Sequence, residues 1–268
     1  MRLCYSGNRM AKYEKYLLTY LDIMGFKGMI DESADDPSKV DRILTILQHM
    51  RRQAEMSQNF MFPHSEKQIQ NFSDLIVRAS PLLPSESVIE QVWGECWILA
   101  AIQCELILEQ EILLRGAMCL NQLYMKNNLV FGPALVRAYQ LEADVAVFPR
   151  IVIDTAIMDL VTEKDSRPLD LFITRADDGA YFIDYLAAAF MSPTILLGYD
   201  HPSNMLAAHK IRVEHKLLEL SNKGERAKQK AIWLALYHNA AVTRLAQSNR
   251  NLKTKMKHWL IPEKHLSR

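Results

Sequence analysis

Two aspartates in apolar surroundings are the residues of this chain whose type and placement point most clearly to chemistry. Asp22 lies in the run LTYLDIMGFKGM, and a run of this composition is typical of a buried strand that ends at a glycine turn. Asp74 has a similar setting in NFSDLIV. A buried carboxylate costs several kcal/mol unless something compensates its charge. The position of each aspartate therefore predicts a partner for it.

A divalent cation is one such partner. Each aspartate falls in the middle or at the end of a predicted strand, with one predicted helix between the two strands. When such strands are neighbours in a palm-like sheet, both carboxylates can point at one spot, where they repel each other unless a cation lies between them. Mg²⁺ and Mn²⁺ accept hard oxygen ligands, and two ions about 3.5–4 Å apart can activate a hydroxyl group and hold a leaving pyrophosphate. The alternative, an aspartate that only caps the following turn, stays open.

A glycine turn follows Asp22. In IMGFKG, Gly25 and Gly28 allow backbone N–H groups to approach an anion closely, and Lys27 adds a positive charge nearby. The turn therefore favours a phosphate-binding position next to the predicted cation site.

The overall composition is that of an ordinary globular protein. Of the 268 residues, 49% are hydrophobic and 24% are charged, and the net charge of +1 gives no field for gathering nucleic acid or an anionic membrane. The four cysteines show no CxxC spacing, so neither a disulfide framework nor a zinc knuckle is predicted. The N-terminus lacks the apolar core of a secretion signal, and the most apolar later run, VWGECWILAAIQCELILEQEILL, contains four glutamates. We therefore expect a soluble cytoplasmic protein.

The hydrophobic pattern predicts the elements that position these residues. Residues 16–23 form a predicted strand, and residues 40–50 have helical spacing with Ser38 as the N-cap. A second strand is expected in KQIQNFSDLIVRAS, and a long helix over residues 87–110. The run LLRGAMCLNQLYMKNNLVFG predicts a hairpin that turns at KNN, and GPALVRAYQLEADVA predicts a helix with Pro133 in its first turn. FPRIVIDTAI is strand-like, and two short strands are expected on either side of the turn DDG.

This order of elements predicts an α+β fold, a ferredoxin-like palm with helices on one face of an antiparallel sheet. From about residue 204 the composition becomes helical, with two charged amphipathic segments divided near Asn222 and Gly224. We therefore expect a catalytic domain over residues 1–200 and a C-terminal helical extension over residues 201–268. The extension would pack on the palm or on a second subunit.

Five blocks of the sequence resemble the class III nucleotide cyclases. They are YLDIMGF, NFSDLIV, LLRGAM, FGPALVRAYQLE and FPRIVID, and the resemblance covers roughly residues 16–186. The similarity is greatest to the bacterial pyrimidine cyclases, the uridylate and cytidylate cyclases of the Pycsar antiphage system. The resemblance implies a cyclase palm that works as a homodimer with active sites at the interface. It also implies a reaction that turns a nucleoside triphosphate into its 3′,5′-cyclic monophosphate and pyrophosphate.

The resemblance also assigns site residues by position. Asp22 and Asp74 match the two metal-binding aspartates, and Ile23 matches the residue that lends a backbone carbonyl. Two Mn²⁺ or Mg²⁺ ions per site are implied. The phosphate-facing turn of the family corresponds to Gly25, Phe26 and Lys27.

Departures from the purine cyclases point to a pyrimidine substrate. Where those enzymes carry a base-recognising lysine or glutamate, four residues before the second aspartate, this chain has Gln70. Leu129 stands where they often place an aspartate, three residues before the glycine of FG. The charge pair that recognises a purine is therefore absent. The amide of Gln70, with both a donor and an acceptor, suits the edge of uracil or cytosine.

The positions for transition-state stabilisation differ as well. The family's asparagine and arginine in the following helix correspond to Val136 and Gln140, so we expect the adjacent Arg137 and Tyr139 to supply replacement donors. A solvated helix cation and a core aromatic are the alternatives for these two residues. Arg175, in ITRADDG, occupies roughly the place of the family's triphosphate lysine, although a hairpin-edge arginine is more often only solvated.

We therefore expect a metal-dependent cyclase that makes 3′,5′-cyclic UMP from UTP, with a separate effector protein reading this second messenger in antiphage defence. No nucleic-acid or membrane partner is expected. The alternatives are a cytidylate cyclase, a purine cyclase, a non-catalytic nucleotide sensor and, from the C-terminal half, a helical scaffold. Arg115, in RGAM, fits a strand of the palm better than a catalytic guanidinium, and Arg150 is expected to pair with a carboxylate beneath the sheet.

Overall fold

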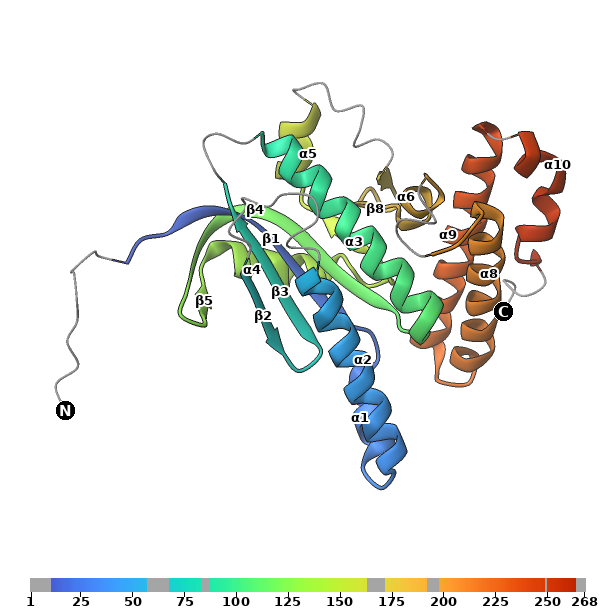
Figure 1. The fold of residues 1–268 in the computed structure, drawn as a ribbon, viewed down its shortest axis with the longest axis horizontal. Coiled ribbons are helices and arrows are strands. Elements are labelled where there is room, and N and C mark those ends of the chain that lie inside the picture. Colours follow the sequence, from blue (N-terminus) through green and yellow to red (C-terminus); the bar gives the residue numbers. More distant parts are fainter. Residues whose placement is uncertain are drawn as a thin grey trace.

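A mostly antiparallel sheet forms the centre of the structure (Figure 1). The computed structural model describes residues 11–56, 68–82, 87–162, 172–191, 198–248 and 250–263. Its strands are β1 (Glu14–Ile23), β2 (Gln68–Phe72), β3 (Leu75–Pro81), β4 (Leu114–Lys126), β5 (Leu129–Phe131), β6 (Ile151–Ile153), β7 (Ile173–Arg175) and β8 (Tyr181–Ile183). Its helices are α1 (Phe26–Ser33), α2 (Pro37–Met56), α3 (Val88–Gln110), α4 (Pro133–Asp144), α5 (Thr155–Thr162), α6 (Tyr185–Met191), α8 (Pro202–Ser221), α9 (Glu225–Ser248) and α10 (Arg250–Trp259).

The sheet has the strand order β2-β3-β1-β4-β6-β8-β7, with β5 paired to the C-terminal end of β4. β1 runs antiparallel to both of its neighbours, β3 and β4. Among the strand pairs of the described ranges only β4 and β6 run parallel. The predicted α+β fold class is confirmed, as are the hairpin that turns at Asn127 and Asn128, the long helix and the helix that begins at Pro133.

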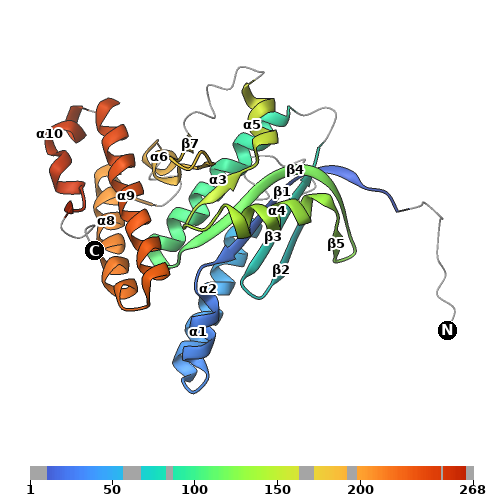
Figure 2. The same ribbon diagram turned by 180° about the vertical axis from the view of Figure 1, so that it is seen from behind.

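Helices cover both faces of the sheet, whereas the sequence predicted one face. Thr19 of β1 donates a hydrogen bond of 3.1 Å to Glu95 on α3, while the next residue, Tyr20, has its ring 6.3 Å from that of Tyr139 on α4. Successive strand residues point to opposite faces, so α3 and α4 lie on opposite sides of β1. In Figure 1 α3 lies in front of the sheet and α4 behind it, and in Figure 2, seen from the other side, α4 lies in front. The unbroken buried run over residues 16–19 has the same cause, because both sides of the strand are covered.

The second predicted strand is a hairpin. β2 and β3 pair through Phe72 and Leu75, which leaves Ser73 and Asp74 as a two-residue turn, and Ser73 adopts a positive φ of 55°. Asp74 therefore lies in a turn and not in the middle of a strand. Serine and aspartate are turn-forming residues, and this signal was hidden inside an otherwise apolar run.

Two helices replace the single one predicted after β1. The glycine turn leads directly into α1, and α2 begins at Pro37, because proline suits the first helical position. Asp36 accepts hydrogen bonds from both the backbone N–H and the hydroxyl of Ser38, at 3.0 and 2.6 Å. The capping oxygen therefore belongs to Asp36 and not, as predicted, to Ser38.

The C-terminal helices pack on the palm. Arg212 of α8 donates to the Leu108 carbonyl at the end of α3, and Tyr237 of α9 donates to Asp184 at 2.7 Å. The apolar core is continuous from the sheet into α8, α9 and α10. One of the two predicted packing modes, packing on the palm, is therefore present, and the division at residue 200 stays a prediction. No helix in the described ranges is both long and apolar enough to span a membrane.

Candidate active site

Asp22 and Asp74 come together at one end of the sheet. Asp22 is the penultimate residue of β1, and the pairing of Leu21 with Ile76 brings the β2–β3 turn alongside it. Burial raises the pKa of the Asp22 carboxyl; Arg115 opposes this rise, and the charge and hydrogen bond of Asp74 add to it. The two carboxyl groups, remote in the chain, are therefore direct neighbours.

Arg115 stands opposite Asp22 on β4 and bridges two acids. Its Nε lies 2.9 Å from Asp22 Oδ2 and 2.6 Å from Oε1 of Glu142, a residue of α4. The sequence predicted Arg115 as a strand residue and not as a catalytic guanidinium. Its place in β4 confirms the strand, and its pairing with Asp22 across the sheet points its guanidinium to the same face as Asp22.

Glu142 is a site residue that the sequence analysis missed. Its side chain is 4% exposed, burial raises the pKa of its carboxyl, and Oε1 has no hydrogen-bond partner with satisfactory geometry despite its closeness to Arg115. The signal was present, because Glu142 follows the fully buried Ala138 by four residues and so lies on the apolar side of α4. An acid on that side points toward the sheet.

The donor set of this cluster fits a hard divalent cation. Three carboxyl groups, those of Asp22, Asp74 and Glu142, gather around one arginine that pairs with two of them, and Glu142 Oε1 has no hydrogen bond within the described residues. The excess of negative charge also acts on Tyr20, whose pKa is raised to about 12 by burial and by Glu142 and Asp22. Carboxylate oxygens are the ligands that Mg²⁺ and Mn²⁺ prefer. In the described ranges no three acidic, histidine or cysteine side chains are arranged so that together they could hold a metal ion, so the fit rests on the type of the ligands and not on a formed site.

The glycine turn after Asp22 presents backbone donors next to these acids. Gly25 precedes α1 with a φ of 81°, a conformation that favours glycine, and a Cβ there would meet no atom within 4 Å. Gly25, the N-cap residue, offers α1 no side-chain cap, which leaves the first N–H groups of the helix open to an anion as far as the described residues show. Phe26 is buried and anchors the turn, while Lys27 is exposed.

Gln70 and Leu129, the predicted base-recognising residues, lie beside each other near the tip of the sheet. Gln70 pairs with Val77, which pairs with Tyr20, so Gln70 shares the face of Tyr20 and Asp22. Its amide donates to the Asn128 side chain at 3.4 Å, next to Leu129, which is 60% exposed.

Arg137 and Tyr139 are on α4 but have different surroundings. The Arg137 guanidinium forms a two-pronged ion pair with Asp154, at 2.8 and 2.9 Å. Tyr139 packs edge-on against Tyr20 and is 56% exposed. Neither residue belongs to the Asp22 cluster of its own chain, and their predicted roles stay predictions.

Arg175 lies on β7, the edge strand that β6 and β8 separate from β4. Its guanidinium donates to the Gly179 carbonyl and lies over the ring of Tyr181 at 5.4 Å. Within one chain it is therefore remote from Asp22. Arg150 pairs with Asp178, as predicted, and also lies over the ring of Trp233.

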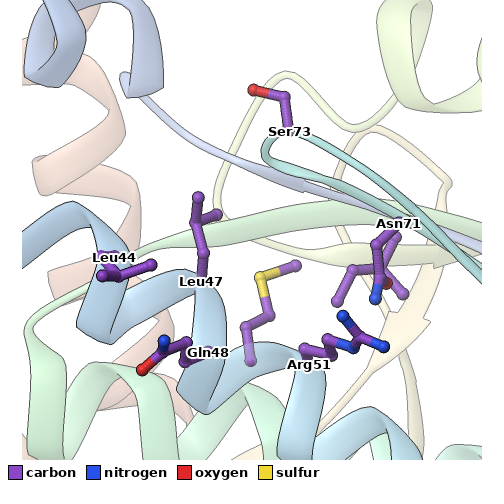
Figure 3. A pocket seen from close by; sticks show the side chains of 8 residues that line it. Leu44, Leu47, Gln48, Arg51, Asn71 and Ser73 are labelled. Carbon is purple, nitrogen blue, oxygen red and sulfur yellow. The ribbon is translucent and has the colours of Figure 1, made fainter.

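An apolar pocket lies on the other side of the β2–β3 hairpin from this cluster. Figure 3 shows Leu44, Leu47 and Arg51 of α2 on one wall and Asn71 of the hairpin on the other. Its volume is about 320 Å³. Asn71 pairs with Ile76, on the face opposite to Gln70, so this pocket is separate from the carboxylate cluster.

Comparison with known proteins finds distant structural similarity only. No family model and no curated protein matches the chain. Similar solved structures include the adenylyl cyclase CyaB from P. aeruginosa (14% identity, TM-score 0.47, 65% of this chain and 96% of that one). Two others are an adenylate/guanylate cyclase/hydrolase from Silicibacter pomeroyi (13%, 0.37, 65% and 96%) and a class III adenylyl cyclase-like ATP-binding protein from Pseudomonas aeruginosa (13%, 0.45, 67% and 40%). At these values neither substrate nor metal follows from the similarity.

Proposed function

We propose that this protein is a metal-dependent nucleotide cyclase that converts UTP into 3′,5′-cyclic UMP and pyrophosphate. The observation that carries the proposal is the meeting of Asp22, at the end of β1, and Asp74, in the β2–β3 turn, beside the start of α1. Carboxylates that would repel each other suit a divalent cation, and free backbone N–H groups beside them suit the phosphates that accompany such a cation.

The reaction requires the ribose 3′-oxygen to bond to the α-phosphorus while the bond from that phosphorus to the bridging oxygen breaks. Pyrophosphate leaves, and the 3′-hydroxyl proton passes to solvent. A bound Mg²⁺ or Mn²⁺ pair supplies Lewis-acid activation of the hydroxyl and charge stabilisation of the leaving group. Asp22 and Asp74, with the Ile23 carbonyl, would hold the ions, and the turn at Gly25, Phe26 and Lys27 would orient the phosphates.

Arg115 supports the same interpretation. A guanidinium that bridges Asp22 and Glu142 neutralises part of the acidic cluster when no ion is bound. With a cation held by Asp22, Arg115 would be free to pair with a phosphate oxygen, an anion that matches the guanidinium fork.

The base preference rests on Gln70 and Leu129. Their adjacency at the hairpin tips supports one base-recognition position, with an amide for hydrogen bonding and an apolar side chain where a purine-specific acid is absent. An amide fits uracil and, after a flip, cytosine, so CTP is the alternative substrate.

A homodimer is part of the proposal. The face that carries α4 and β5 exposes large apolar side chains whose burial would stabilise a dimer. They are Leu129, Phe131, Val136 and Tyr139. A second copy packed here would bring its own Arg137, Tyr139 and Arg175 toward the Asp22 cluster, which the geometry of one chain does not do. As a second-messenger synthase of antiphage defence, the protein would act through a separate effector that binds the product.

A non-catalytic nucleotide sensor is the second candidate. The pair between Arg137 and Asp154 favours it, because it occupies a guanidinium that catalysis would need. Tight nucleotide binding without turnover in the presence of Mn²⁺ would support the sensor.

The test is to incubate the purified full chain with UTP, CTP, ATP and GTP separately, with Mn²⁺, and to identify products by mass. Cyclic UMP as the dominant product is expected. Dominant cyclic AMP or GMP would overturn the base assignment, and no cyclic product from any of the four would overturn the cyclase.

A further inference from the structure

The first turns of α9 lie between two contacts with segments that flank the carboxylate cluster. At their start, Lys223 in the α8–α9 turn lies 3.2 Å from Glu32 of α1, the helix that follows Asp22. Further along, the Trp233 ring stacks on Phe148, just beyond α4, with ring centroids 5.5 Å apart. α9 is therefore anchored on the helix after Asp22 and next to the end of the helix that carries Glu142. In both ribbon views this part of α9 lies beside the start of β4 (Figures 1 and 2).

Lys230 is a half-buried cation between these two anchors. It precedes Trp233 by one helical turn, so its side chain leaves α9 on the side that faces the palm. Burial lowers the pKa of Lys230, the positive charges of Arg115 and Arg226 lower it further, and the carboxylates of Asp22 and Glu142 oppose this. Lys230 thus lies between two contacts that flank the cluster, within reach of the charges of Asp22, Glu142 and Arg115, and it forms none of the ion pairs found in the described residues.

We propose that Lys230 binds the polyphosphate of the substrate, so that the C-terminal helices complete the active site in addition to packing against the palm. This inference rests on the proposed function of the Asp22 cluster. A partly buried ammonium without a carboxylate partner is poorly compensated until an anion arrives. Once divalent ions have neutralised the aspartates, the phosphates are the remaining negative groups beside it. Arg226, one turn earlier on the same side and exposed, is placed to assist from the rim.

The test measures binding of inorganic tripolyphosphate, with Mn²⁺, to the full chain by calorimetry, together with KM and kcat for the triphosphate that is turned over. Lys230→Met removes the charge and keeps the apolar stem, Lys230→Arg keeps the charge, and Lys228→Met is the matched control on the opposite side of α9. Circular dichroism and thermal unfolding check that each variant folds.

We expect Lys230→Met to weaken tripolyphosphate binding by about tenfold or more, because a hydrogen bond to a charged group is lost. Lys230→Arg should retain most of the affinity and Lys228→Met all of it, and KM should rise more than kcat falls. Unchanged binding in Lys230→Met, an equal loss in Lys228→Met, or no tripolyphosphate binding by the native chain would overturn the proposal. A Lys230-dependent loss of binding in a chain that makes no cyclic product would uphold this inference and overturn the cyclase instead.

Discussion

The two faces of β1 carry buried charges of opposite character. On the α3 face, Glu95 accepts hydrogen bonds from Thr19 and from two nitrogens of Arg78, at 2.9 to 3.1 Å, and both charged side chains are almost fully buried. On the α4 face, Arg115 bridges Asp22 and Glu142, and a third carboxyl group, that of Asp74, adjoins Asp22. The cluster around Glu95 is balanced in charge and in hydrogen bonds. The cluster around Arg115 has more carboxyl groups than cations.

The difference separates a structural cluster from a functional one. A buried charge with a complete set of partners fixes the packing of a helix on a sheet and has nothing left to offer a ligand. An incomplete cluster costs stability, and proteins keep such costs where a ligand supplies the missing partner. The contrast predicts that changes on the α4 face affect activity and changes on the α3 face affect stability.

The largest effect is expected from Asp74→Asn. The substitution keeps the turn and its hydrogen bonds but removes one charge from the cluster, so product formation should fall by about a thousandfold or more. Thermal unfolding should change little or shift upward, because Asp22 loses a repelling neighbour. Asp144→Asn, an exposed acid at the end of α4, is the control and should keep full activity. Sustained synthesis of cyclic nucleotide by Asp74→Asn would refute the metal role.

The next largest effect is expected on the α3 face of β1, and it is an effect on stability. Arg78→Met leaves Glu95 buried without its cation, and breaking such a pair typically costs about 3–5 kcal/mol of unfolding free energy. Activity per folded molecule should stay close to that of the native chain. The double variant Arg78→Met with Glu95→Leu should recover much of the loss, because neither charge then remains buried. Urea unfolding of the three proteins measures this, and a single variant as stable as the native chain would break the comparison.

The sequence predicted the elements better than their surroundings. Apolar runs and turn residues located β1, the β4–β5 hairpin and α4, because local composition determines them. The side of the sheet on which α4 packs, the turn position of Asp74 and the partners of Arg115 depend on register between strands remote in the chain. Glu142 shows the same limit: only the fold reveals that an acid on the apolar side of a helix meets the end of β1.

A third buried cluster, formed by Tyr185, His209 and His238, also has a complete set of hydrogen bonds, and its stability should depend on pH. In the C-terminal helices, the Trp259 carbonyl can only accept from His238 Nε2–H, so His238 Nδ1 accepts from His209, whose Nε2 accepts from the Tyr185 hydroxyl. In this arrangement both histidines are neutral and each of their ring nitrogens has a partner. Burial, with the positive charge of Lys210 nearby, lowers the pKa of His238 from 6.5 to about 4, and burial lowers that of His209 as well.

The sign of the pH effect follows from these shifts. Below pH 6.5 the unfolded chain takes up protons that the folded chain does not, so the folded state loses stability as the pH falls toward 4. The loss is roughly 1.4 kcal/mol per pH unit for each histidine that stays neutral. Urea unfolding between pH 7 and pH 5 should show the slope, His238→Gln should reduce it, and His258→Gln, an exposed control, should keep it. If the unfolding free energy had the same pH dependence in the native chain and in both variants, the neutral state of His238 would not contribute to stability.

The smallest expected effect concerns the Asp22 cluster, where Arg115 and a bound ion would compete for one carboxylate. At a tenfold excess of Mn²⁺ over its dissociation constant, binding should stabilise the native chain by about 1.4 kcal/mol. Asp74→Asn should abolish this gain. Arg115→Gln should do the reverse, because the guanidinium and the ion compete for the Asp22 carboxylate, and calorimetry should find tighter Mn²⁺ binding once the guanidinium is gone. If Arg115→Gln instead weakened Mn²⁺ binding, Arg115 would be holding Asp22 in place for the ion, and the two faces of β1 would differ less than their charge balance indicates.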